Sequence, residues 1–135
     1  MDAPRLQALL AEIGADYVKR LGLIVDEAEP GRVTLSMPVT PEVVHAGGVV
    51  CGQAIMSAAD TAMLLAMIAQ LGEFRPMTTV QMQTSFVRPV GKDVKRVAVE
   101  AKVLRFGKTL SYGDVTFSTP DGRLAAHATT TYALI

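Results

Sequence analysis

The chain has 135 residues, half of them apolar, and its 13 Lys and Arg residues balance its 13 Asp and Glu residues. This length fits a single domain, residues 1–135, with a sizeable core. The zero net charge gives no field that would draw the protein to nucleic acid or to an anionic membrane. The single cysteine, Cys51, excludes an internal disulfide framework and a cysteine-rich zinc site, and it fits a reducing compartment. We therefore expect a cytoplasmic globular protein.

The first 22 residues predict a short amphipathic helix and not a secretory signal, because no basic segment precedes an apolar one. The apolar positions at helical spacing are Leu6, Leu9, Leu10, Ile13 and Val18. Residues 21–39 then predict a hairpin of two short strands around a turn at 29–32. A loop over 38–48, punctuated by proline and glycine, leads into an apolar helix over 51–72 that should stop at Gly72.

From residue 77 onward apolar and polar residues alternate, which predicts four strands, and the short links between them favour antiparallel neighbours. The helix over 51–72 is apolar on almost every side, so it must be covered almost all round. A curved antiparallel sheet wrapped around it, with a second subunit covering more, would do so. The sequence thus predicts an α+β domain that forms a dimer.

One carboxylate interrupts that helix. Asp60 is the only charged residue from 43 to 72, and it shares a helix face with Gln53, Ser57 and Thr61. A solvated face usually carries Lys, Glu or Arg, so we expect Asp60 in a cleft or a subunit interface. Carboxylates in clefts are candidate bases or nucleophiles.

The segment HAGGVVCGQ, residues 45–53, precedes this face. Its glycines, Gly48 among them, let the backbone approach a ligand, and free N–H groups at a helix start can stabilise an oxyanion. A carboxylate and such donors suffice for hydrolysis by acyl transfer. Two alternatives stay open here: Cys51 is a nucleophile or an apolar filler, and His45 serves the site or caps the loop. No nucleotide-binding motif or metal-ligand spacing is present, so we expect neither a metal nor a cofactor.

These segments resemble the hotdog-fold acyl-CoA thioesterases of the phenylacetate-degradation, or PaaI-like, type. The resemblance covers about residues 20–135. It lies in the loop HAGGVVCGQ, the helix segment SAADTAM, the spacing of eight from Gly52 to Asp60, and the RP and FGK turns.

The resemblance implies a hotdog fold and an acyl-CoA substrate, of which coenzyme A is a part and not a cofactor. It implies that Asp60 is the general base or nucleophile, that the Gly52 N–H binds the thioester oxygen, and that the Thr79 hydroxyl lies near the attacking water. It further implies an obligate homodimer, often paired into a tetramer, in which acid and oxyanion donor come from different subunits. The residues expected to contact substrate are His45, Gly48, Cys51, Gln53, Gly107 and Lys108.

Three loop positions depart from the family pattern. Cys51 stands where the family usually has His, His45 where it usually has Asn, and Gln53 where it has a second Gly. Two alternatives to the thioesterase therefore remain. One is a hotdog hydratase or dehydratase that would use His45 and Asp60, and the other is a dimer that binds acyl-CoA without catalysis.

Overall fold

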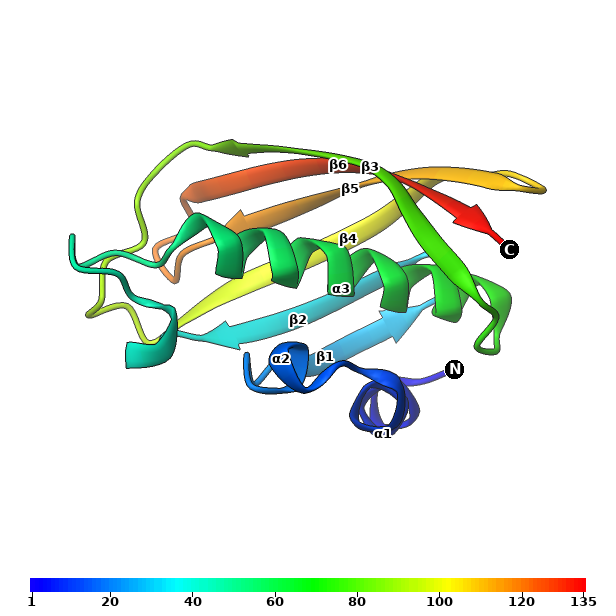
Figure 1. Cartoon of the computed structure of the whole chain (residues 1–135), viewed down its shortest axis with the longest axis horizontal. Helices are drawn as coiled ribbons and strands as arrows, with labels where there is room; N and C mark the ends of the chain where they lie inside the picture. The colour runs from blue at the N-terminus through cyan, green and yellow to red at the C-terminus, as the bar shows by residue number, and fades with distance from the viewer.

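The computed structural model describes residues 1–135 and contains a six-stranded antiparallel sheet curved around one long helix (Figure 1). The helices are α1 (Ala3–Ile13), α2 (Asp16–Lys19), the 3₁₀ turn η1 (Pro41–Val43) and α3 (Gly52–Leu71). The strands are β1 (Ile24–Glu29), β2 (Arg32–Pro38), β3 (Met77–Phe86), β4 (Arg96–Phe106), β5 (Leu110–Ser118) and β6 (Leu124–Leu134). The predicted α+β hotdog architecture is confirmed.

The order of strands in the sheet is β1-β2-β4-β5-β6-β3. The expectation that sequential strands after residue 77 would all be neighbours is wrong for β3, which pairs with β6 and not with β4. Both edges of β4 are occupied, one by β2 and the other by β5, so β3 has no place beside it. The chain therefore crosses from β3 back to the middle of the sheet, and β3 is left as an edge strand.

Helix α3 forms the centre of the core, and 12 of its 20 residues are buried. A Cβ atom at Gly113 of β5 would lie 2.4 Å from Met63 Cε, so this glycine lets the helix approach the sheet closely. As predicted, the helix stops at Gly72, whose φ of 80° is left-handed and whose N–H donates to the Ile68 carbonyl at 2.8 Å. By length and hydropathy α3 could cross a membrane, but 67% of its most apolar window is buried inside the domain.

The N-terminal segment forms two helices where one was predicted. Helix α1 buries Leu6 and Leu10 and ends at Gly14, whose extended backbone turns the chain. Val18 therefore lies on the separate short helix α2. Helix α1 lies beside β1 at one side of the sheet, and α2 contacts α3 (Figure 1).

The Gln7 side chain of α1 takes the place of a neighbouring strand for β1. Its amide nitrogen donates to the Leu23 carbonyl at 3.1 Å, and the Val25 N–H donates to Gln7 Oε1 at 2.7 Å. Val25 is buried, so without Gln7 its N–H would be left unpaired away from water. This pair of bonds also covers part of an otherwise free strand edge.

Replacing Gln7 by alanine should lower the free energy of unfolding by about 1–3 kcal/mol, the usual cost of an unpaired buried donor. Urea denaturation measures the change. Glu12→Ala on the same helix is the control, because Glu12 is exposed and its loss should change stability by less than about 0.5 kcal/mol. Equal midpoints for Gln7→Ala and the unchanged protein would contradict the edge-covering role.

Candidate active site

Asp60 lies on the side of α3 that faces β3 and β6, and two hydroxyl groups of the sheet hold its carboxylate. Thr79 Oγ1 donates to Asp60 Oδ1 at 2.6 Å, and Tyr132 Oη lies 2.5 Å from the same oxygen. The Tyr132 hydroxyl also lies 2.7 Å from the main-chain oxygen of Asp60. Asp60 forms no ion pair, and its Oδ2 has no hydrogen-bond partner within the chain. The structure therefore shows a half-buried carboxylate with one oxygen held and the other free.

The other three polar residues on this face of α3 form no hydrogen bond with β3 or β6. The hydroxyls of Ser57 and Thr61 donate to the carbonyls four residues earlier, each at 2.8 Å. Ser57 also lies 3.0 Å from the Tyr17 hydroxyl of α2, and Gln53 is exposed. Of the four polar residues on this helix face, Asp60 is therefore the one held by hydroxyl groups of the sheet.

Burial raises the pKa of the Tyr132 phenol well above its usual range, and the neighbouring charge of Asp60 raises it further. The opposing effect of the Thr79 hydroxyl is smaller. Tyr132 therefore stays protonated and remains a hydrogen-bond donor throughout the neutral and moderately alkaline range.

The shift of the Tyr132 pKa makes stability depend on pH above about 10, the ordinary tyrosine value. There the unfolded chain loses the phenol proton while the folded chain keeps it, so the free energy of unfolding falls as pH rises, by up to about 1.4 kcal/mol per pH unit. Urea midpoints measured between about pH 9 and 11 test this. The decline should be shallower in Tyr132→Phe, and an identical slope in both proteins would contradict it.

Gly52 is the first residue of α3 and precedes Asp60 by eight residues. The N–H groups of the first turn have no acceptor inside the helix, and no side chain caps them. A Cβ atom at Gly52 would lie 3.2 Å from Phe86 Cζ, so the ring of Phe86 lies against the helix start. A cavity of about 370 Å³ opens beside it, lined mainly by apolar residues such as Val50, Ile55 and Val90. Free N–H groups thus adjoin an apolar cavity.

Gly52 and Asp60 do not meet within one chain. They are eight residues apart on a straight helix, which separates them by about 12 Å along its axis. One copy of the chain therefore brings Thr79 to Asp60 but not the N–H of Gly52.

The loop before α3 is braced by its own bonds. His45 Nδ1 accepts from the Gly47 N–H at 2.8 Å, and the Gly48 N–H donates to the His45 carbonyl at 2.9 Å. The Cys51 N–H donates to the Val43 carbonyl at 2.8 Å. Of the two interpretations of His45, the observed bonds are those of the loop cap.

The family model of the thioesterase superfamily matches residues 47–126, which include the loop, α3 and the site around Asp60. The chain belongs to the thioesterase superfamily. Over 115 residues it is 33% identical to "Putative esterase SSO2140" of Saccharolobus solfataricus, a match that covers 84% of this chain and 80% of that protein.

Solved structures share the fold over nearly the whole chain. A thioesterase family protein from Silicibacter pomeroyi is 26% identical with a TM-score of 0.85, over 98% of this chain and 97% of that one. The E. coli PaaI protein of the phenylacetic acid degradation operon is 21% identical with a TM-score of 0.84, over 98% and 93%. The protein smu.793 from Streptococcus mutans, solved with acetyl-CoA bound, is 19% identical with a TM-score of 0.76, over 84% and 88%. The chain is therefore a hotdog protein of this superfamily.

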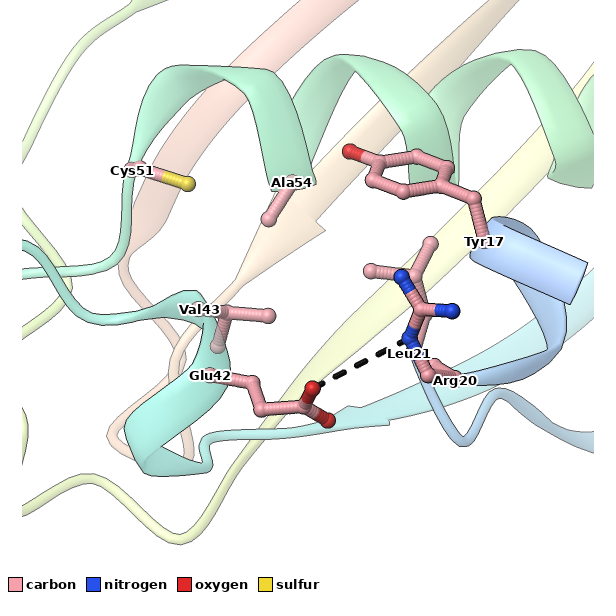
Figure 2. Close-up of a pocket in the computed structure, with 7 residues that line it drawn as sticks. All are labelled: Tyr17, Arg20, Leu21, Glu42, Val43, Cys51 and Ala54. Atoms are coloured by element: carbon pink, nitrogen blue, oxygen red, sulfur yellow. Dashed lines mark ion pairs between the residues drawn. The ribbon is translucent and has the colours of Figure 1, made fainter.

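Cys51, where the resemblance leads one to expect His, lines a different cavity from Gly52. Its thiol borders a small pocket of about 90 Å³ between α2, η1 and the start of α3 (Figure 2). The ring of Tyr17 borders the same pocket, and Arg20 and Glu42 form an ion pair at 3.9 Å beside it. The Cys51 side chain thus faces the pocket beside α2, and not the cavity that Gly52 and Phe86 line.

Gly107 and Lys108 lie in the tight turn between β4 and β5. A Cβ atom at Gly107 would lie 2.0 Å from the Leu110 carbonyl oxygen, so only glycine fits, and the Gly107 N–H donates to Ser111 Oγ at 3.2 Å. Lys108 is exposed. This turn and the start of α3 lie at opposite ends of the molecule (Figure 1).

Sequence reasoning missed Tyr132. Its position in the alternation of β6 predicts an inward-facing side chain, and a buried tyrosine needs a partner for its hydroxyl. Nothing in the sequence links it to a carboxylate 72 residues away. In the structure no group of three or more His, Cys, Asp or Glu side chains could hold a metal ion.

Proposed function

We propose that this protein is an acyl-CoA thioesterase that hydrolyses a thioester to a free acid and coenzyme A. The observation that carries the proposal is Asp60, a half-buried carboxylate held through one oxygen in a helix that is otherwise without charge. Membership of the thioesterase superfamily supports hydrolysis. The acetyl-CoA bound to smu.793 supports a coenzyme A thioester as the substrate.

In this mechanism Asp60 Oδ2 has one of two roles. Either it takes a proton from the water that attacks the thioester carbonyl carbon, or it attacks that carbon itself. The carbonyl oxygen gains negative charge and accepts a hydrogen bond from the N–H of Gly52 at the start of a helix, where the dipole favours an anion. Collapse of the tetrahedral intermediate breaks the C–S bond. When Asp60 is the base, the proton that it took passes to the departing sulfur, and the free acid and the coenzyme A thiol leave. When Asp60 is the nucleophile, the acyl group stays on Asp60 as an anhydride, and a water molecule hydrolyses it to the free acid and restores the carboxylate.

The proposal requires a dimer, because the acid and the donor lie about 12 Å apart in one chain. The exposed edge of β3 supports this, since Met77–Phe86 contains no charged residue and exposes 57% of Val80 and 53% of Phe86. The opposite edge, β1, carries Asp26, Glu27 and Glu29, which discourage pairing with another strand. An edge strand that is free and uncharged can pair through its backbone with a strand of a second chain.

Antiparallel pairing of β3 with its copy would assemble the site. Thr79, bonded to Asp60, lies near the start of β3, and Phe86, which contacts Gly52, lies at its end. Two such strands related by a two-fold axis place the start of one beside the end of the other. Gly52 of the partner subunit would then approach Asp60, and two equal sites would form per dimer.

Turnover of an acyl-CoA panel tests the proposed function. The purified protein is supplied with short-chain, medium-chain, aromatic and long-chain acyl-CoA, and release of the coenzyme A thiol is followed. We expect hydrolysis of at least one class. Binding without turnover across the whole panel would contradict the proposal and favour a binding dimer, and hydration of enoyl-CoA in its place would favour the hydratase.

A further inference from the structure

We propose that Tyr132 is a positioning residue that fixes the rotamer of Asp60 and leaves Oδ2 as the reacting oxygen. This inference rests on the proposed hydrolysis and names a residue that serves it. The phenol oxygen lies 2.5 Å from Asp60 Oδ1 and 2.7 Å from the main-chain oxygen of the same residue. One hydroxyl group therefore contacts both the backbone and the side chain of Asp60.

This double contact restricts the carboxylate in a way that a single bond would not. The carboxylate oxygen and the main-chain oxygen are both acceptors and repel each other, so they share one donor only in a narrow range of side-chain torsions. Thr79 Oγ1 donates to the same Oδ1 at 2.6 Å from a second direction. With Oδ1 bonded to two hydroxyls, Oδ2 is the oxygen with lone pairs available for reaction.

Tyr132 is rigidly placed for this role. Its Cα pairs with Thr79 of β3 on one side and with Ser111 of β5 on the other, so its backbone lies inside the sheet. The side chain is only 4% exposed, so the ring has little room to move. Thr79 and Tyr132 are thus paired residues of neighbouring strands, and both hydroxyls contact Asp60 Oδ1.

A purely structural role would need only the bulk of the ring. Phenylalanine would keep that bulk and lose the hydroxyl, so Tyr132→Phe separates the two roles. Because a displacement of about 1 Å in a reacting group can cost about 100-fold in rate, we expect kcat to fall about 10-fold to 100-fold. We expect KM to stay within about twofold, since in the proposed role the phenol acts on Asp60 and not on the substrate.

The test measures kcat and KM of Tyr132→Phe on the best acyl-CoA, with Tyr112→Phe as the matched control. Tyr112 is 44% exposed and makes no hydrogen bond with its hydroxyl, so its variant should match wild type. The same change is made in an Asp60→Asn background. There Tyr132→Phe should leave the residual rate within about twofold, because the hydroxyl acts only through the carboxylate.

Three outcomes would overturn the inference. They are an unchanged kcat in Tyr132→Phe, a rise in KM that accounts for the whole loss, and an equal further loss in the Asp60→Asn background. Inactivity of the wild-type protein on every thioester is a different result, because it contradicts the proposed function itself.

Melting curves verify that each variant is folded at the assay temperature. If Tyr132→Phe does not fold, a fluorotyrosine placed at position 132 keeps the ring and the hydroxyl but changes the acidity of the phenol. Because a stronger or weaker bond to Oδ1 changes the pKa of a carboxylate, a shifted pH profile of kcat at an unchanged melting temperature would support the role of the hydroxyl, and an identical pH profile would overturn it.

Discussion

Asp60→Asn should reduce thioester hydrolysis to a small residual rate and leave the fold intact. We expect kcat to fall by about 10²-fold to 10⁴-fold, the range for loss of a positioned base, because an amide neither takes a proton nor attacks a carbonyl. The amide oxygen can still accept from Thr79 and Tyr132, which hold Oδ1 at 2.6 and 2.5 Å, so the loss should not come from unfolding. Initial rates with saturating acyl-CoA measure the change.

Asp16→Asn is the matched control for this substitution. Asp16 is a carboxylate on α2 whose side chain is 93% exposed, so its variant should hydrolyse at the wild-type rate. Binding of coenzyme A to Asp60→Asn should be unchanged within about twofold, because the carboxylate acts on the reacting carbonyl and not on the coenzyme. Hydrolysis at the wild-type rate by Asp60→Asn would exclude Asp60 as base and as nucleophile.

The fold was largely predictable because its elements have strong local signals. The apolar helix ending at Gly72 and the alternating strands from residue 77 follow from periodicity, and an almost wholly apolar helix requires a cover. The place of β3 was not predictable from local pattern. Short links favour adjacency, but β4 has both its edges occupied by β2 and β5, so β3 lies at the edge of the sheet.

The candidate site, like the fold, could be predicted only in part from the sequence. A lone carboxylate in an apolar helix is visible in the sequence, and so are the glycines before it. The contact of Thr79 with Asp60 required the family resemblance, since nothing local joins a strand hydroxyl to a helix carboxylate 19 residues earlier. Neither the local sequence pattern nor the family resemblance indicated Tyr132, because its role depends on the pairing of β6 with β3, which only the folded sheet defines.

Gly52→Pro should lower kcat about 10²-fold to 10³-fold, because it removes the N–H proposed to bind the oxyanion. Proline is tolerated at the first position of a helix, and Cys51 before it has the extended backbone, φ −70° and ψ 149°, that proline requires. Gly52→Ala is the matched control, since its Cβ meets Phe86 at the same 3.2 Å but its N–H remains. Equal losses in both variants would assign the effect to Phe86 and not to the N–H.

Mixing the two inactive variants tests whether the site is shared. In a heterodimer of an Asp60→Asn chain and a Gly52→Pro chain, one site combines both defects. The other joins the intact Asp60 of one chain with the intact Gly52 of the other. Heterodimers purified through two different tags should therefore regain about half of the wild-type activity, one working site of two. If acid and donor came from the same chain, every site would keep one defect, so a heterodimer as inactive as its parents would exclude the shared site.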